Sequence, residues 1–75
     1  MDVMESVLVS LGANVRHLRE RQGWTQSELA HAIKTSRVTI GRIERGEQNV
    51  TVLLLAAIAK SLRVNLVDLF GDHPD

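Results

Sequence analysis

Two short helical segments joined by a tight connection limit the fold of this chain more than any other feature of its sequence. Residues 26–33 and 37–45 carry helix signals, and only Lys34-Thr35-Ser36 lies between them. Helices joined by three or four residues cross at a steep angle, and the second can then project into a DNA major groove. A small helical bundle with a tight corner would produce the same pattern. The apolar positions expected to hold the pair together are Leu29, Ala30, Ile33, Ile40 and Ile43.

A longer helical pattern precedes this pair. Its apolar residues step by four and three positions, the period of a helix with one buried face: Met4, Leu8, Leu11, Val15 and Leu18. We expect a helix over about residues 6–22, ended by Gly23, which can adopt the left-handed cap conformation. Gly12 costs such a helix about 1 kcal/mol relative to alanine, which indicates a close backbone contact there.

Capping residues mark the starts of the remaining helices. Thr25 and Glu28 have the spacing of a capping box, and Trp24 and Leu29 that of a hydrophobic staple. Ser36 is a good N-cap for a helix that Gly46 closes, and the staple spacing recurs at Val50…Leu55 and Val64…Leu69. The sequence therefore predicts an all-α fold with helices near residues 6–22, 26–33, 37–45, 52–62 and 66–70.

The charge distribution points to one basic face. The net charge is zero, but residues 16–46 hold seven basic and three acidic residues, a net of +4. A basic face suits a polyanionic partner, although a solvated mixed-charge surface would give the same distribution. The chain has no cysteine, no signal-peptide pattern and no apolar run near the ~20 residues that a membrane span needs. We expect a cytoplasmic protein.

Three stretches of the chain resemble a known family. Gln26-Ser-Glu-Leu-Ala30, Thr35-Ser-Arg-Val-Thr-Ile40 and Arg42-Ile-Glu-Arg-Gly46 are similar to the helix-turn-helix of the phage repressor and Cro family, also called XRE. The likeness runs from about Leu11 to Phe70 and implies a compact five-helix, lambda-repressor-like DNA-binding domain. Residues 1–10 would then be an N-terminal extension that leads into or joins the first helix, residues 11–70 the domain, and residues 71–75 a tail.

The chain departs from the family pattern at the turn. Lys34 stands where the family usually has glycine, which implies either a left-handed non-glycine residue or a different turn. Thr35 replaces a usual apolar residue, and Val50 stands where proline is common. The loop Gly46-Glu-Gln-Asn-Val-Thr51 resembles that of the controller proteins of restriction-modification systems.

The resemblance implies roles for individual residues. Arg37, Val38, Gly41 and Arg42 would face the bases, since arginine can bond guanine and valine can contact a thymine methyl group. The residues assigned to phosphates are Gln26, Ser36, Thr39 and Arg45. Helix N-termini favour such contacts, although exposed side chains at these positions could equally bind water. Gly41 would let the helix sit deep in the groove.

Other positions are expected to be structural. By resemblance, Arg19 and Glu44 form an ion pair between the first and third helices. Trp24 and Phe70 are interpreted as a staple residue and a core plug rather than as stacking platforms. The histidines His17, His31 and His73 lack metal-ligand spacing, and no catalytic set can be assembled. We expect no enzyme activity, no metal or other cofactor and no small-molecule ligand.

The fourth predicted helix indicates a homodimer. Every residue from 52 to 59 is apolar, and a helix apolar all round is normally buried all round. Leu55, Ile58, Ala59 and Leu62 would cover the core, leaving as interface residues Leu53, Leu54, Ala57 and Val67. Alternatively, Leu53 folds back on the N-terminal segment near Val3 and Val7.

The expected function is sequence-specific binding of double-stranded DNA by a homodimeric transcriptional regulator acting on a pseudo-palindromic operator, with autoregulation among its expected roles. Restriction-modification controllers, phage repressors and antitoxins are the open contexts. The alternative is an antitoxin-like module that masks a partner protein. Basic and small residues on the third helix favour DNA, whereas an apolar stripe would favour protein.

Overall fold

The computed structural model describes residues 2–71 and contains four α-helices followed by one 3-10 turn. The α-helices are α1 (Val3–Arg21), α2 (Gln26–Ala32), α3 (Arg37–Glu44) and α4 (Val52–Leu62). The fifth expected α-helix is instead η1, a 3-10 helix over Leu66–Leu69, so the all-α class is right and the count of five α-helices is wrong. The segment is only four residues long, too short for an α-helix of ordinary length. Most of the predicted tail, including His73, lies outside the described residues.

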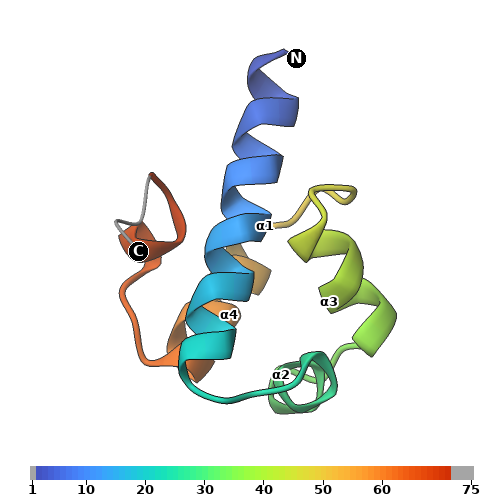
Figure 1. The fold of residues 1–75 in the computed structure, drawn as a ribbon, viewed down its shortest axis with the longest axis vertical. Coiled ribbons are helices and arrows are strands. Elements are labelled where there is room, and N and C mark those ends of the chain that lie inside the picture. Colours follow the sequence, from blue (N-terminus) through green and yellow to red (C-terminus); the bar gives the residue numbers. More distant parts are fainter. Residues whose placement is uncertain (1, 72–75) are drawn as a thin grey trace.

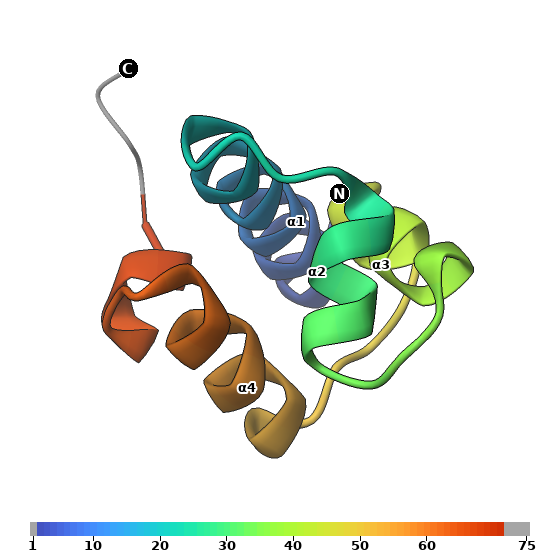
Figure 2. The ribbon, with the colours of Figure 1, turned by 90° about the horizontal axis from the view of Figure 1, so that it is seen from below.

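The first helix starts at Val3, earlier than the predicted start near residue 6. Asp2 is its N-cap, and one Asp2 carboxylate oxygen accepts a hydrogen bond from the backbone N–H of Glu5 at 2.7 Å. Residues 3–10 therefore continue α1 without a break. The N-terminal turns of α1 project beyond the other helices, and α2 and α3 lie on one side of it with η1 on the other (Figure 1). The view along α1 separates the α2–α3 pair from α4 and η1 (Figure 2).

All four α-helices end in the same backbone arrangement, a Schellman motif with one left-handed residue. That residue is Gly23 after α1, Lys34 after α2, Gly46 after α3 and Arg63 after α4. After α2, for example, the Lys34 N–H donates to the His31 carbonyl at 3.2 Å and the Thr35 N–H donates to the Ala30 carbonyl at 2.9 Å. With φ at 60°, Lys34 takes the left-handed conformation, the first of the two alternatives for this turn.

The core lies where the helices meet. Leu29, Ile40 and Ile43 from the α2–α3 pair pack with residues of α1, α4 and η1, and Trp24, Ile33 and Val50 pack against this cluster while half-buried. Phe70 is 44% exposed, so its expected role as a core plug is wrong. Leu69 is fully buried instead, because the backbone turns to an extended conformation at Phe70.

Gly12 confirms the expected close contact between backbones. A Cβ atom at this position would lie 2.2 Å from the Ile43 carbonyl oxygen and 2.7 Å from that of Glu44. The absence of a side chain at Gly12 therefore lets α1 and the C-terminal end of α3 touch. This contact fixes where α3 sits relative to the rest of the molecule.

Candidate nucleic-acid interface

The N-terminus of α2 is set by the capping box expected from the sequence. The Thr25 hydroxyl accepts from the Glu28 N–H at 3.0 Å, and the Glu28 carboxylate accepts from the Thr25 N–H at 2.8 Å. Gln26 is the first residue of α2 and is half-buried. Its position at a helix start gives it free backbone donors and the positive end of the helix dipole.

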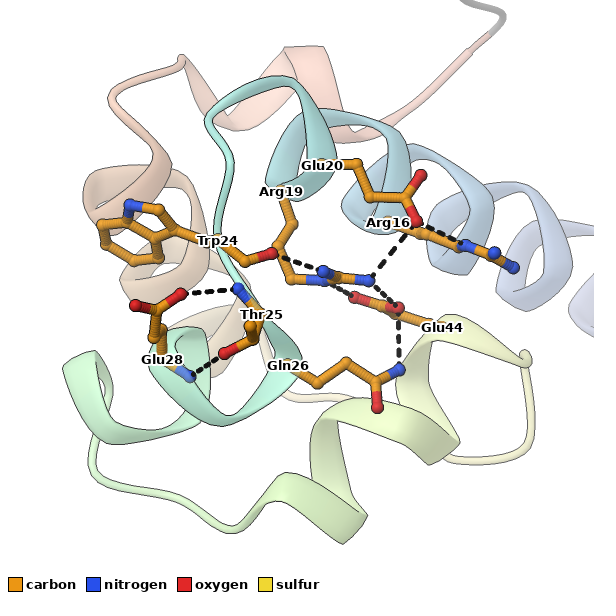
Figure 3. A network of polar contacts seen from close by, with 8 residues as sticks. All are labelled: Arg16, Arg19, Glu20, Trp24, Thr25, Gln26, Glu28 and Glu44. Carbon is orange, nitrogen blue, oxygen red and sulfur yellow. Dashed lines mark hydrogen bonds and ion pairs between the residues drawn. The ribbon is translucent and has the colours of Figure 1, made fainter.

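A polar network ties the three helices of this region together (Figure 3). Arg19 of α1 makes a two-point ion pair with Glu44 of α3, Nε to Oε2 at 2.7 Å and Nη2 to Oε1 at 3.0 Å. The Gln26 side-chain amide also donates to Glu44 Oε1 at 3.0 Å, and Arg19 Nη1 donates to the Trp24 carbonyl at 2.5 Å. Only 8% of the Arg19 side chain and 3% of the Glu44 side chain are exposed.

The charges of Arg19 and Glu44 balance each other within this network. The hydrogen bond and the charge of Glu44 raise the pKa of Arg19 above its usual value, while burial opposes that shift. Because Arg19 neutralises Glu44, the buried carboxylate does not present a net negative charge to the surface near Gln26. The pair holds α1, α2 and α3 in one fixed arrangement.

One face of α3 is free of the core. Ile40 and Ile43 are buried, while Arg37 and Arg42 are exposed and Val38 is 54% exposed. The helix begins at Ser36, whose hydroxyl accepts from the Thr39 N–H at 3.0 Å and lies 2.9 Å from the Thr39 hydroxyl. Arginine and valine side chains thus share the outward face of the second helix of the pair.

Gly41 lies on the same face of α3 by its helical position, but it is not exposed, contrary to expectation. It is buried, because the Arg45 side chain folds back over it: a Cβ atom on Gly41 would lie 3.2 Å from Arg45 Nη1 and 3.8 Å from Gln26 Oε1. Arg45 itself is the C-cap of α3, and its side chain is 58% exposed. Arg45 Nε donates to Glu47 at 3.0 Å.

The residues assigned to a dimer interface divide into two groups. Leu53 and Val67 are 83% and 69% exposed, so Leu53 does not fold back on the N-terminal segment. Leu54 and Ala57 are half-buried, and Leu54 packs against the core, which corrects the expectation that it points away. The reason is the helical register, since Leu54 lies one helical turn before the buried Ile58 on α4. Further large apolar residues exposed on α4 and after it are Val52, Leu66 and Phe70.

Sequence reasoning missed several polar side chains. Asn14 is buried, and its amide donates to the carbonyls of Leu69 at 3.0 Å and Gly71 at 2.8 Å, which ties α1 to the end of η1. Gln22 similarly donates to the Leu62 carbonyl at the end of α4. A usable signal existed for Asn14, which lies three residues after Leu11 and four before Leu18, on the apolar face of α1.

Together, the steep α2–α3 pair, its network and the outward arginines define a helix-turn-helix protein. The Helix-turn-helix family model HTH_3 matches residues 15–69. The chain belongs to this family, which confirms the resemblance to the phage repressor and Cro proteins. Within residues 2–71, no helix is both long and apolar enough to cross a membrane.

Individual relatives agree with this assignment. The chain is 37% identical over 62 residues to the competence pilus inhibition repressor of Acinetobacter baylyi, covering 83% of this chain and 56% of the relative. The restriction-modification controller protein C.AhdI from Aeromonas hydrophila has a TM-score of 0.87 and 30% identity, covering 92% of this chain and all (100%) of that one. The biofilm master regulator SinR, solved in complex with DNA, has a TM-score of 0.75 and 27% identity, and the match covers 79% of this chain and 95% of that one. The chain spans between 34% and 56% of the length of three curated relatives that it matches.

Proposed function

We propose that the protein is a sequence-specific, non-catalytic double-stranded DNA-binding transcriptional regulator. The observation that carries the proposal is the outward face of α3, where Arg37, Val38 and Arg42 are exposed while Ile40 and Ile43 anchor the helix in the core. A helix held this way can enter a major groove as a rigid body. Similarity to a repressor and to a regulator solved with DNA supports the same conclusion. The proposal places the protein in the cytoplasm, which holds the DNA of a bacterial cell.

In this proposal, the α3 side chains read sequence. The guanidinium groups of Arg37 and Arg42 would bond guanine O6 and N7, and Val38 would contact a thymine methyl group. Gly41 would make no base contact unless Arg45 moves off it, so it is the weakest of the four base-contact assignments.

Phosphate contacts would position the protein on the duplex. One N–H of the Gln26 side-chain amide donates to Glu44, and the second could donate to a phosphate. The backbone N–H groups at the N-terminus of α2 could do the same. The Ser36 and Thr39 hydroxyls and the Arg45 guanidinium lie near the two ends of α3 and complete the set. Such contacts fix register without carrying sequence information.

The function is tested by selecting binding sites from a random duplex library and titrating the selected duplex at several salt concentrations. Each phosphate neutralised should contribute about −0.9 to the slope of log K against log salt concentration. We expect a steep slope for all duplexes and a defined consensus from the selection. Failure to enrich any sequence, together with affinity that ignores salt, contradicts the proposal.

We further propose that the active form is a homodimer built on α4 and η1. Leu53 and Val67 expose large apolar side chains, and exposed apolar surface on a small domain marks an interaction site. A two-fold dimer would read half-sites about 34 Å apart, one turn of DNA, on a pseudo-palindromic operator. The dimer would also bury further apolar surface, since a domain of about this size, 75 residues here, buries a smaller share of its surface than a larger one.

The dimer is tested with Leu53→Glu and a matched control, Val3→Glu. Leu53 is 83% exposed and Val3 is 81% exposed, so the two changes place a charge on equally open apolar positions of different helices. Sedimentation should show a monomer with weakened operator binding only for Leu53→Glu. A wild type that is monomeric at micromolar concentration and fully active on a single half-site would contradict the dimer.

A protein-masking role is the second candidate function, because the exposed apolar residues of α4 and η1 would also suit a different protein partner. The two candidates differ in whether the wild type selects an operator. Under the regulator proposal the wild type selects one and Leu53→Glu loses cooperative binding to it, whereas under the masking proposal the wild type selects none. Similarity to C.AhdI makes autoregulation in a restriction-modification system the preferred biological context, tested by a reporter gene driven from the protein's own promoter.

A further inference from the structure

The position of Glu47 is fixed relative to α3 by the backbone. The Glu47 N–H donates to the Arg42 carbonyl at 2.9 Å as part of the Schellman motif that closes the helix. The Glu47 carboxylate therefore does not belong to a freely moving loop. It stands at the end of α3, where it meets the Arg45 guanidinium.

Arg45 is held in a folded conformation rather than extended outward. Its Nε atom donates to Glu47 at 3.0 Å, and its Nη1 atom lies over Gly41, one helical turn back. Any side chain at Gly41 would meet this guanidinium at 3.2 Å, so Gly41 provides the space in which it rests. The side-chain oxygen of Gln26 lies beside the same point, at 3.8 Å.

The charges of Arg45 and Arg42 act on Glu47. The hydrogen bond from Arg45 lowers the pKa of Glu47, partly offset by desolvation, and the charges of Arg45 and Arg42 lower it further. Glu47 therefore stays ionised at neutral pH. One carboxylate faces two of the cations that the proposed function assigns to DNA.

We propose that Glu47 is an intramolecular competitor of DNA phosphate for Arg45, and thereby limits the affinity of the protein for duplex of any sequence. The inference rests on the proposed function. To extend fully toward a phosphate, Arg45 gives up its hydrogen bond to Glu47 and moves off Gly41, and Glu47 then remains near the DNA as an anion without this partner. That anion repels the DNA backbone and binds a cation from solution. This uptake offsets the release of the counterion that the contact of Arg45 with a phosphate displaces.

The test is Glu47→Gln, measured by fluorescence anisotropy on a labelled mixed-sequence duplex of about 30 base pairs, long enough for two half-sites. We expect binding about fivefold tighter at low salt, the size of effect typical for the loss of one exposed ion pair. The slope of log K against log salt concentration should steepen by about 0.9. Glu20→Gln is the control, because both glutamates are 54% exposed and each pairs with an exposed arginine. Glu20 also lies 3.8 Å from Nη2 of the buried Arg19, so thermal melting must show that its replacement leaves that network intact.

The dependence on Arg45 separates competition from simple repulsion. In an Arg45→Ala background, Glu47→Gln should give a clearly smaller gain in affinity and a smaller change in slope, because only the repulsion between Glu47 and the DNA backbone is relieved there. An equal gain with and without Arg45, or an equal gain from Glu20→Gln, overturns the inference. If the wild type and Glu47→Gln both fail to bind duplex at low salt, the proposed function fails; if both bind equally, only the role of Glu47 fails. Glu47 and Arg45 are exposed, and thermal melting of each variant checks that the fold is intact.

Discussion

Replacing Gly12 with alanine is the sharpest perturbation that the structure offers. The new Cβ atom would lie 2.2 Å from the Ile43 carbonyl oxygen, whereas non-bonded heavy atoms in good contact are about 3.5 Å apart. The neighbouring atoms are all backbone, the Ile43 oxygen and the Glu44 carbonyl, so no side chain can rotate away. The C-terminal end of α3 must therefore move by about 1 Å relative to α1.

Two opposing terms decide the size of the effect. Overpacking of this kind costs about 1–3 kcal/mol, and backbone partners place it toward the upper end. Replacing glycine with alanine within a helix stabilises the helix by about 1 kcal/mol. We therefore expect a net loss of about 1–2 kcal/mol in the free energy of unfolding and a fall in Tm of about 5–15 °C. Because Glu44 moves with α3, the ion pair with Arg19 should also weaken.

The assay is thermal and urea denaturation followed by far-ultraviolet circular dichroism, with duplex binding as a second readout. Gly23→Ala is the control: nothing lies within 4 Å of its added Cβ atom, but φ is +75°, so its cost is backbone strain of about 1 kcal/mol without helix movement. Only Gly12→Ala should reduce duplex binding beyond its effect on stability. An unchanged or raised Tm for Gly12→Ala refutes the reasoning that this contact sets the position of α3.

Further substitutions test the network, the turn and the reading face. Arg19→Met or Glu44→Gln should each lower Tm, because each leaves a buried partner unpaired at a cost of about 3 kcal/mol. The double variant should recover part of this loss. Unchanged melting of both single variants contradicts a structural pair. Lys34→Gly should raise stability by about 1 kcal/mol in urea denaturation, since φ is 60° there, and a loss of stability would show that the Lys34 side chain makes a compensating contact. Arg37→Ala should cost about 1–3 kcal/mol at the selected site and relax base preference in a repeated selection, whereas uniform weakening across all sequences would make Arg37 a phosphate contact.

Local signals predicted the helices that carry the candidate site. Thr25, Ser36 and Thr51 stand at the observed N-caps, and Gly23 and Gly46 at two of the left-handed cap positions. These signals work because a capping hydroxyl or a glycine acts on backbone groups within a few residues of itself. The same reasoning placed the start of α1 near residue 6 and missed Asp2 as its N-cap, although the apolar spacing already began at Met4.

Assignments of exposure were less successful. Gly41 is buried only because the side chain of Arg45 covers it, and Leu54 is half-buried because α4 packs with that edge toward the core. Phe70 is exposed although it is the larger neighbour of the buried Leu69. Helical periodicity states which residues share a face, but side-chain conformation and packing between elements decide which residues are covered.

By itself, the sequence determined the all-α class, the tight α2–α3 connection and the family, because helix periodicity and caps are short-range and the family motif is carried by residue identity. Only the tertiary structure decided how α3 is held: the contact of Gly12 with the Ile43 carbonyl, the amide of Asn14 on the end of η1, and the folded Arg45 beside Glu47. These features join residues from different elements or depend on side-chain conformation. Their distances follow from how the elements pack, which no local pattern encodes.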